Sequence, residues 1–241
     1  MTHKLAIVTG DSSGLGKSLR DALLKQNWFV VGISRRASVV DHKEYLYISA
    51  DLSELELSQE KLGDKLSSLS SKDFDQVALV NNAGTIQPVL GLSKIPGAEL
   101  AKAVTLNLTT PMWLTSYVLD TFSHSQIKVV NISSGAATKA YEGWGTYCST
   151  KAALRMASQV LAAERPDVQV LSYAPGVIDT PMQEEVRGSA KTEFPNLERF
   201  IGLHENGQLV KPELPAHEIC DFLNSEASEA NYHEYRYGDK K

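Results

Sequence analysis

Apolar and polar residues follow two periods along this chain. Short apolar runs rich in β-branched residues recur and read as buried strands; they cover residues 5–9, 29–34, 45–49, 77–81, 127–132 and 168–174. Between most of them lie stretches of helical period. Leu15, Leu19, Ala22 and Leu23, for example, are spaced to form one stripe on a helix. The sequence therefore predicts an alternation of strands and helices.

Such an alternation favours an α/β fold of the Rossmann type, a doubly wound parallel sheet of about seven strands with helices on both faces. The unbroken apolar run at residues 77–80 supports strands that are covered on both sides. We expect one domain over residues 1–241. Tyr235 and Tyr237 belong either to a last edge strand or to a loosely ordered tail.

Three longer segments carry further expectations. Residues 149–164 read as a helix that Pro166 stops, and residues 97–122 read as another helix that Pro111 breaks or kinks. Residues 179–209 depart from the strand and helix alternation. They form either a lid over a binding site or a surface helical insertion without a role in catalysis.

Composition narrows the class of protein. The 241 residues are 42% apolar, which suits an ordinary globular domain, and they contain no run long enough to span a bilayer and no signal peptide pattern. We expect a cytoplasmic protein without a membrane partner. The net charge of −5 argues against nucleic-acid binding. Cys148 and Cys220 are too few for a disulfide framework and lack metal-ligand company, so no metal site is predicted.

A glycine-rich turn links the first strand to the first helix. Residues 9–16 read TGDSSGLG, and glycines at such a turn let backbone N–H groups approach a pyrophosphate at the helix N-terminus. The predicted cofactor contacts there are Gly10, Ser12, Ser13, Gly14, Leu15 and Gly16. The spacing matches the general dinucleotide fingerprint only in part, and a flexible turn without a ligand is the alternative.

The second strand ends in two arginines, Arg35 and Arg36. An NAD-binding chain usually places an acid here to hold the ribose 2′-hydroxyl, whereas guanidinium groups bind a 2′-phosphate. The pair therefore predicts NADP(H). The alternative is a pair of solvated surface charges.

Tyr147 and Lys151 lie one helical turn apart, so that the lysine cation can favour ionisation of the phenol. This spacing alone is weak, because Tyr237 and Lys241 repeat it. Ser134, thirteen residues before Tyr147, distinguishes the first pair.

The order of these motifs resembles the short-chain dehydrogenase/reductase family over residues from about 5 to 182. The resemblance rests on the glycine-rich turn and on residues that follow it in the family's order: Asp51, Leu52, Asn82, Ala83, Gly84, Asn107, Ser134, Tyr147, Lys151, Pro175 and Gly176. It implies that Tyr147 is the general acid in carbonyl reduction and that Ser134 holds the substrate oxygen. Lys151 would lower the pKa of Tyr147 and bind the nicotinamide ribose, and Asn107 would place a water that relays protons to Lys151.

The resemblance also implies which residues contact each part of the cofactor. Asp51 and Leu52 would border the adenine, residues 82–84 its ribose, and Ile178 and Thr180 the nicotinamide amide. Tyr147, Lys151, Pro175 and Gly176 would complete the cofactor-binding set. Family members usually pair through the helices that hold Asn107 and Tyr147, so we expect a homodimer or homotetramer.

Within the family, the chain is similar to the sepiapterin reductases and benzil reductases. Residues 179–183, DTPMQ, and the Trp144-Gly145 pair before the tyrosine carry this similarity. It implies an NADPH-dependent reductase of a ketone or vicinal dicarbonyl substrate. Tyr235 or Arg236 stands where sepiapterin reductases have an aspartate that grips the pterin, which weakens a pterin substrate. The alternatives are a non-catalytic NADP-binding regulator and a reductase of sepiapterin, ketoacyl, sugar or steroid substrates.

Overall fold

One parallel sheet organises the molecule. The computed structural model describes residues 3–37 and 40–239. Within these residues, seven strands follow the order β3-β2-β1-β4-β5-β6-β7, and every neighbouring pair is parallel. The strands are β1 (Lys4–Thr9), β2 (Phe29–Ser34), β3 (Tyr45–Ser49), β4 (Gln76–Asn81), β5 (Gln126–Ile132), β6 (Gln169–Ala174) and β7 (Tyr232–Arg236). The predicted fold class is confirmed.

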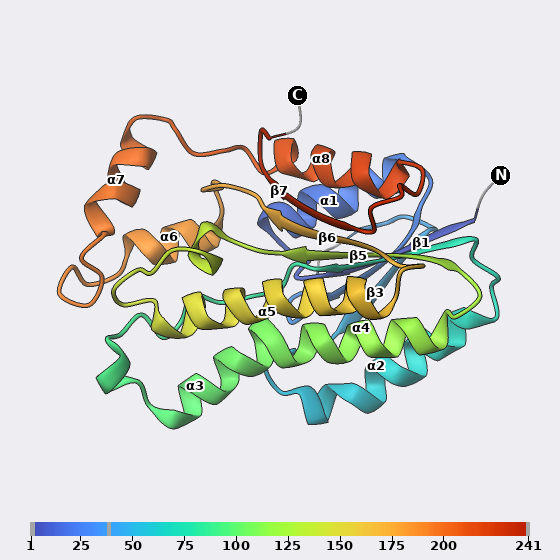
Figure 1. Ribbon diagram of the computed structural model, residues 1–241, viewed down its shortest axis with the longest axis horizontal. Coiled ribbons are helices and arrows are strands. Elements are labelled where there is room, and N and C mark those ends of the chain that lie inside the picture. The colour runs from blue at the N-terminus through green and yellow to red at the C-terminus, as the bar shows by residue number, and fades with distance from the viewer. Residues whose placement is uncertain (1–2, 38–39, 240–241) are drawn as a thin grey trace.

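Helices cover both faces of the sheet. On one face lie α1 (Gly14–Lys25) and α8 (Glu213–Asn224), and on the other α2 (Leu55–Ser70), α4 (Thr110–Thr121) and α5 (Gly145–Glu164) (Figure 1). The stripe of Leu15, Leu19 and Leu23 is buried in the first layer, as its spacing predicts. Leu62 and Leu66 of α2 are buried in the second layer. Burial on both faces explains why the central strands read as continuous apolar runs.

The helix predicted over residues 97–122 is interrupted earlier than expected. It divides into α3 (Gly97–Val104), a π-helical turn at Thr105–Thr109 and α4. Pro111 lies in the first turn of α4, directly after the π turn, and it has no N–H to donate to a carbonyl of the preceding turn. The predicted interruption of this helix is present as a π turn, which ends two residues before Pro111.

The helix predicted over residues 149–164 begins four residues sooner, since α5 starts at Gly145 and ends at Glu164. Tyr147 and Lys151 thus share one regular helix. The tail adopts the first of its two predicted forms, because β7 pairs with β6 with Tyr235 opposite Tyr173. Lys241, the partner of Tyr237 in the repeated spacing, lies outside the described residues.

The segment 179–209 leaves the sheet and returns to the place where it left. Ile178 and Val210 form a β-bridge, and the Asp179 N–H donates to the Val210 carbonyl over 2.9 Å. Between these ends lie α6 (Pro181–Arg187) and α7 (Leu197–Glu205), which extend beyond one end of the sheet (Figure 1). Whether this segment acts as a lid stays a prediction.

In the part of the chain that the structure describes, no helix is both long and apolar enough to cross a membrane.

Candidate active site

A large cavity opens at the carboxyl ends of the strands. The strand order reverses between β1 and β4, and ligands of doubly wound sheets bind beyond the strand ends at such a point. A cavity of about 780 Å³ lies there. Gly10 after β1, Asn82 after β4, Ser133 after β5 and Pro175 after β6 all line it.

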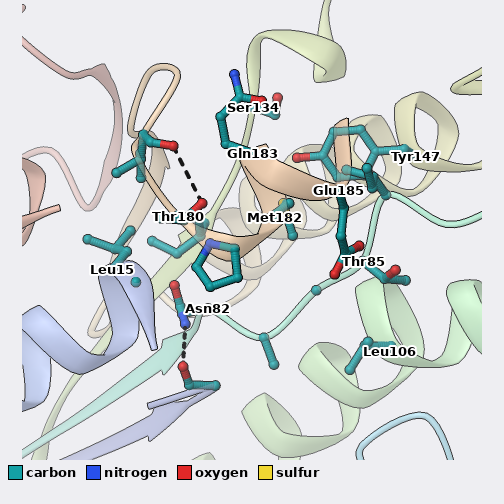
Figure 2. A pocket seen from close by; sticks show the side chains of 18 of the residues that line it. Leu15, Asn82, Thr85, Leu106, Ser134, Tyr147, Thr180, Met182, Gln183 and Glu185 are labelled. Carbon is teal, nitrogen blue, oxygen red and sulfur yellow. Dashed lines mark hydrogen bonds between the residues drawn. The ribbon is translucent and has the colours of Figure 1, made fainter. Parts of the chain in front are cut away.

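The glycine-rich turn is bound tightly to the end of β4. The Thr9 hydroxyl accepts the N–H groups of Asn82 and Ala83, both over 2.9 Å, and the Asn82 side chain donates to the Thr9 carbonyl over 2.8 Å. Figure 2 shows Asn82 beside the cavity. Gly10 has φ +70°, and a Cβ there would lie 3.1 Å from the Ala83 Cα. Only glycine fits this position without strain.

The turn suits the pyrophosphate of a dinucleotide. Gly14 also has a positive φ, and a Cβ on it would lie 2.8 Å from Thr180 Cγ2, so the glycine leaves the passage between them open. No side chain caps the N-terminus of α1, which leaves its first N–H groups and partial positive charge to a bound anion. Gly16 does not line the cavity; a Cβ there would collide with the Gly10 carbonyl, so it serves close packing of the helix on the turn.

The two arginines lie at the adenine end predicted for the cavity. Arg35 and Arg36 both line it, and Arg35 Nη1 is 4.0 Å from Asp51 Oδ2. Burial acts to raise the pKa of Asp51, but hydrogen bonds from Ser53 and the charge of Arg35 bring it below its usual value. The ionised carboxylate is close to Arg35 at the edge of the cavity, and the Arg35 side chain is 68% exposed.

Tyr147 and Ser134 lie at the other end. The Tyr147 side chain is buried, and burial raises the pKa of its phenol, while the hydroxyl of Ser134 lowers it by a smaller amount. Ser134 precedes a short 3₁₀ turn, and its Oγ accepts the Ala136 N–H over 3.1 Å, which fixes the side chain. A buried phenol with a raised pKa keeps its proton at neutral pH.

Lys151 differs from its predicted arrangement. Its ammonium donates to the Ile132 carbonyl over 2.7 Å and lies 5.9 Å from the centre of the Tyr147 ring. Burial lowers the pKa of Lys151 to about 8. We expected the lysine to lower the pKa of Tyr147, yet the net shift of that pKa is upward in this structure because burial outweighs the neighbouring groups.

Asn107 lies behind the cavity and does not line it. The side chain is fully buried in the π turn, where its Oδ1 accepts the Thr85 N–H and its Nδ2 donates to the Thr85 carbonyl, both over 2.8 Å. A Cβ on Gly84 would lie 3.2 Å from Asn107 Oδ1 and 3.7 Å from Lys151 Nζ. The asparagine is therefore near the lysine, and it holds the loop after β4 that runs along the cavity.

Aromatic rings form one wall of the cavity. Tyr141, Trp144 and Phe200 line it. Trp144 stacks on Phe194 with ring centres 4.5 Å apart and meets Tyr147 edge-on at 5.4 Å. Phe194 and Phe200 come from the segment 179–209, so this segment packs directly against the start of α5.

Gln183 is the residue whose position the sequence did not reveal. It lies in α6, is 4% exposed and lines the cavity, and among the described residues neither its Oε1 nor its Nε2 has a hydrogen-bond partner. Figure 2 shows its side chain beside Ser134, with Met182 and Tyr147 around the same part of the cavity. A buried amide without partners is costly, so it indicates a polar group that the site receives. From the sequence, Gln183 is recognisable only as part of a motif, because its burial and its missing partners depend on tertiary structure.

The cavity gathers nearly all of the predicted residues. Apart from Gly16 and Asn107, every predicted residue lines it: Gly10, Ser12, Ser13, Gly14, Leu15, Arg35, Arg36, Asp51, Leu52, Asn82, Ala83, Gly84, Ser134, Tyr147, Lys151, Pro175, Gly176, Ile178 and Thr180. Other charged residues that line it without having been predicted are Glu99, Lys102, Glu185, Arg199 and Arg236.

A glycine-rich turn at the reversal point of a doubly wound sheet, with a buried tyrosine and lysine over the same cavity, defines a dinucleotide-dependent oxidoreductase. The family model of the short chain dehydrogenases matches residues 4–191, and the chain belongs to this family. It is therefore an oxidoreductase that acts on carbonyl or alcohol groups with a nicotinamide cofactor.

Relatives agree with the subgroup indicated by the sequence. The chain is 36% identical over 236 residues to a benzil reductase of Bacillus cereus that forms (S)-benzoin, covering 92% of this chain and 95% of that protein. It is 32% identical to sepiapterin reductase of Bos taurus over 249 residues, covering 95% and 92%. The solved structure of the KRED1-Pglu enzyme superposes with a TM-score of 0.84 at 30% identity, over 95% of this chain and 99% of that one.

Proposed function

We propose that the protein is an NADPH-dependent carbonyl reductase whose substrate is a vicinal dicarbonyl with an aromatic group. The observation that carries the proposal is a single cavity with two chemically different ends. One end carries the Gly10 to Gly14 turn and the arginine pair, and the other carries Tyr147 and Ser134 beside the aromatic wall and Gln183.

Tyr147 would supply the proton. Because burial raises the pKa of its phenol, the group is protonated at neutral pH and can donate to a carbonyl oxygen as that oxygen gains negative charge. The Ser134 hydroxyl would hold the same oxygen. Bound NADPH would supply the hydride to the carbonyl carbon.

Lys151 would help to restore that proton. With a pKa of about 8, its amine exchanges a proton easily near neutral pH, and its bond to the Ile132 carbonyl fixes its position. The nearby Asn107 would hold the loop and a relaying water. These roles require no direct bond between Lys151 and the phenol.

Arg35 and Arg36 support the choice of NADPH over NADH. Both line the cavity at the end of β2, and a guanidinium can bind a phosphate through two parallel hydrogen bonds. Asp51 lies 4.0 Å from Arg35 and accepts the Ser53 N–H, and a guanidinium has five N–H donors, so Arg35 would keep donors for a bound phosphate.

The substrate end supports an aromatic dicarbonyl. Trp144, Tyr141 and Phe200 offer ring surfaces for an aromatic substituent, and the unpartnered amide of Gln183 can donate to a second carbonyl oxygen. The resemblance to benzil reductases agrees with this chemistry.

The test measures the rate of NADPH oxidation with each of four carbonyl compounds, which are benzil, diacetyl, sepiapterin and the monoketone acetophenone. We expect benzil to have the highest kcat/KM. Equal rates with NADH and NADPH would contradict the cofactor assignment, and preference for sepiapterin or for acetophenone would contradict the substrate assignment.

The variant Gln183→Leu tests the proposed hydrogen bond between the Gln183 amide and the second carbonyl oxygen. It removes one hydrogen bond and keeps the volume, so we expect kcat/KM for benzil to fall about 10-fold while that for acetophenone changes little. Met182→Leu, at the neighbouring cavity position, serves as the matched control. Equal losses for both ketones in Gln183→Leu would show that the amide does not read the second carbonyl.

We also propose a homodimer or homotetramer formed through α4 and α5. Met112 on α4 is 51% exposed, and Met156 and Val160 on α5 are 56% and 45% exposed, so these helices present apolar side chains to solvent. Sedimentation equilibrium of the wild type and of Met156→Glu tests this. A monomeric wild type at micromolar concentration would contradict it.

A further inference from the structure

A fully buried carboxylate lies beneath the glycine-rich turn and has no part in the reaction described above. Asp11 follows Gly10 in the turn, and its side chain is 0% exposed. It does not line the cavity, unlike Gly10 and Ser12 on either side of it. A charge buried this completely is stable only with close partners.

Three elements supply those partners. The Ser34 hydroxyl at the end of β2 lies 2.8 Å from Asp11 Oδ1, and the Tyr45 hydroxyl of β3 donates to Oδ2 over 2.5 Å. Arg20 of α1 is 2% exposed; its Nη1 lies 3.5 Å from Oδ2 and donates to the Asp11 carbonyl over 3.0 Å. Burial and the bond to Asp11 raise the pKa of Tyr45, so this phenol remains a donor.

The strand next to the turn is matched to this carboxylate. Gly32 lies in the middle of β2, and a Cβ there would collide with Asp11 Oδ2 and with the Tyr45 hydroxyl. A side chain at this position would therefore displace the carboxylate. The glycine is a cost to a strand, so its presence here indicates that the space is used.

Ser34 is the residue immediately before Arg35. Its Oγ lies within 3.0 Å of the Arg36 carbonyl as well as 2.8 Å from Asp11, and its own carbonyl accepts the Tyr47 hydroxyl over 2.9 Å. The chain is thus fixed at the point where the arginine pair leaves the sheet. The strongest of these contacts is the hydrogen bond to the charged carboxylate.

We infer that Asp11 is a positioning residue for cofactor selection: through Ser34 it holds the end of β2 so that Arg35 and Arg36 face the 2′-phosphate of NADPH. This inference rests on the proposed preference for NADPH. It predicts that the preference is reduced when the link between Asp11 and Ser34 is cut, although Asp11 itself does not line the cavity.

The test compares two variants that each remove one hydroxyl from the same carboxylate. Ser34→Ala cuts the link to the arginine pair, and Tyr45→Phe, the matched control, cuts the link to β3 and leaves Ser34 in place. Dissociation constants for NADPH and NADH are measured by titration calorimetry, without substrate, together with melting temperatures. Asp11→Asn is measured as well where it folds.

We expect Ser34→Ala to reduce the ratio of the NADH to the NADPH dissociation constant about 10-fold, with NADH binding unchanged, because a displaced arginine pair would lose about one hydrogen bond to the charged 2′-phosphate. Tyr45→Phe should lower the melting temperature and keep the ratio. A wild-type ratio with Ser34→Ala would overturn the inference and leave the NADPH preference intact. A wild type that binds both cofactors equally would overturn the NADPH preference, and the inference with it.

Discussion

At the scale of single residues, burial governs the chemistry of the site. Tyr147 and Lys151 are both buried, and burial moves their pKa values in opposite directions, upward for the phenol and downward for the amine. The two pKa values therefore move apart, and the Lys151 ammonium becomes the stronger acid of the pair. A proton passed from Lys151 to an ionised Tyr147 would thus run in the favourable direction.

The buried amine of Lys151 also predicts how stability depends on pH. Between its native pKa of about 8 and its ordinary value of 10.5, the folded protein binds fewer protons at Lys151 than the unfolded chain does. Stability from this group therefore rises with pH across that interval, and the burial cost is fully present below pH 8.

Lys151→Met removes that cost. We expect the free energy of unfolding of the variant minus that of the wild type to be highest at pH 7. This difference should fall by about 2 to 3 kcal/mol between pH 7 and pH 10, at about 1.4 kcal/mol per pKa unit. Urea unfolding at both pH values measures this. Lys65→Met, on the exposed side of α2, is the control and should show no such decline. A difference between Lys151→Met and wild type that stays constant with pH would contradict the account.

At the scale of elements, the start of α5 and the segment 179–209 form one unit. Phe194 is fully buried against Trp144, and the Lys94 ammonium binds the Glu193 carboxylate over 2.8 Å beside it. A Cβ on Gly143 would collide with the Glu193 carbonyl, so glycine permits this close approach. The segment is docked by packing, and its position sets the aromatic wall.

Phe194→Ala tests this docking. The loss of a buried ring should cost about 3 to 5 kcal/mol of stability and should raise KM for benzil more than KM for diacetyl, because only benzil needs the aromatic wall. Phe222→Ala on α8 is the control. It removes a ring of equal size from the hydrophobic core on the face of the sheet that α1 and α8 cover. It should destabilise without changing either KM. If both variants changed KM alike, the effect would belong to general destabilisation.

The sequence predicts the strands and helices well where the hydrophobic periodicity agrees with the glycine and proline residues that end these elements. The strands and the stripe on α1 follow from such patterns, and the order of Ser134, Tyr147 and Lys151 after the glycine-rich turn identifies the site. The bonds of the Asn107 amide to Thr85 could not be foreseen, because they join segments that only the fold brings together. Pro111 predicted an interruption in this helix, but the sequence did not predict that it takes the form of a π turn.

At the scale of the whole molecule, one cavity joins parts that are far apart in the chain. Its lining runs from Gly10 to Tyr237 and draws on both the sheet and the segment 179–209. The partners of Asp11 and the missing partners of Gln183 appear only at this scale, because they depend on which segments the sheet brings together. Neither the composition nor the hydrophobic periodicity of the sequence predicts these contacts or their absence.

A ligand that contacts so much of the molecule should stabilise all of it. NADPH at 100 times its dissociation constant should add about 2.7 kcal/mol to the free energy of unfolding, which raises the melting temperature by roughly 5 to 10 °C in a chain of this size. Differential scanning fluorimetry measures the shift. NADH at the same concentration should give a smaller shift, and equal shifts would contradict selection by the arginine pair.

The most direct test of the central claim is the rate of NADPH oxidation with benzil by the wild type and by Tyr147→Phe, with NADPH binding measured for both. The account predicts turnover by the wild type, and a kcat lower by about 100- to 10,000-fold in the variant with the cofactor still bound. A wild type that binds NADPH but reduces no carbonyl, or a variant that retains the full rate, would contradict it.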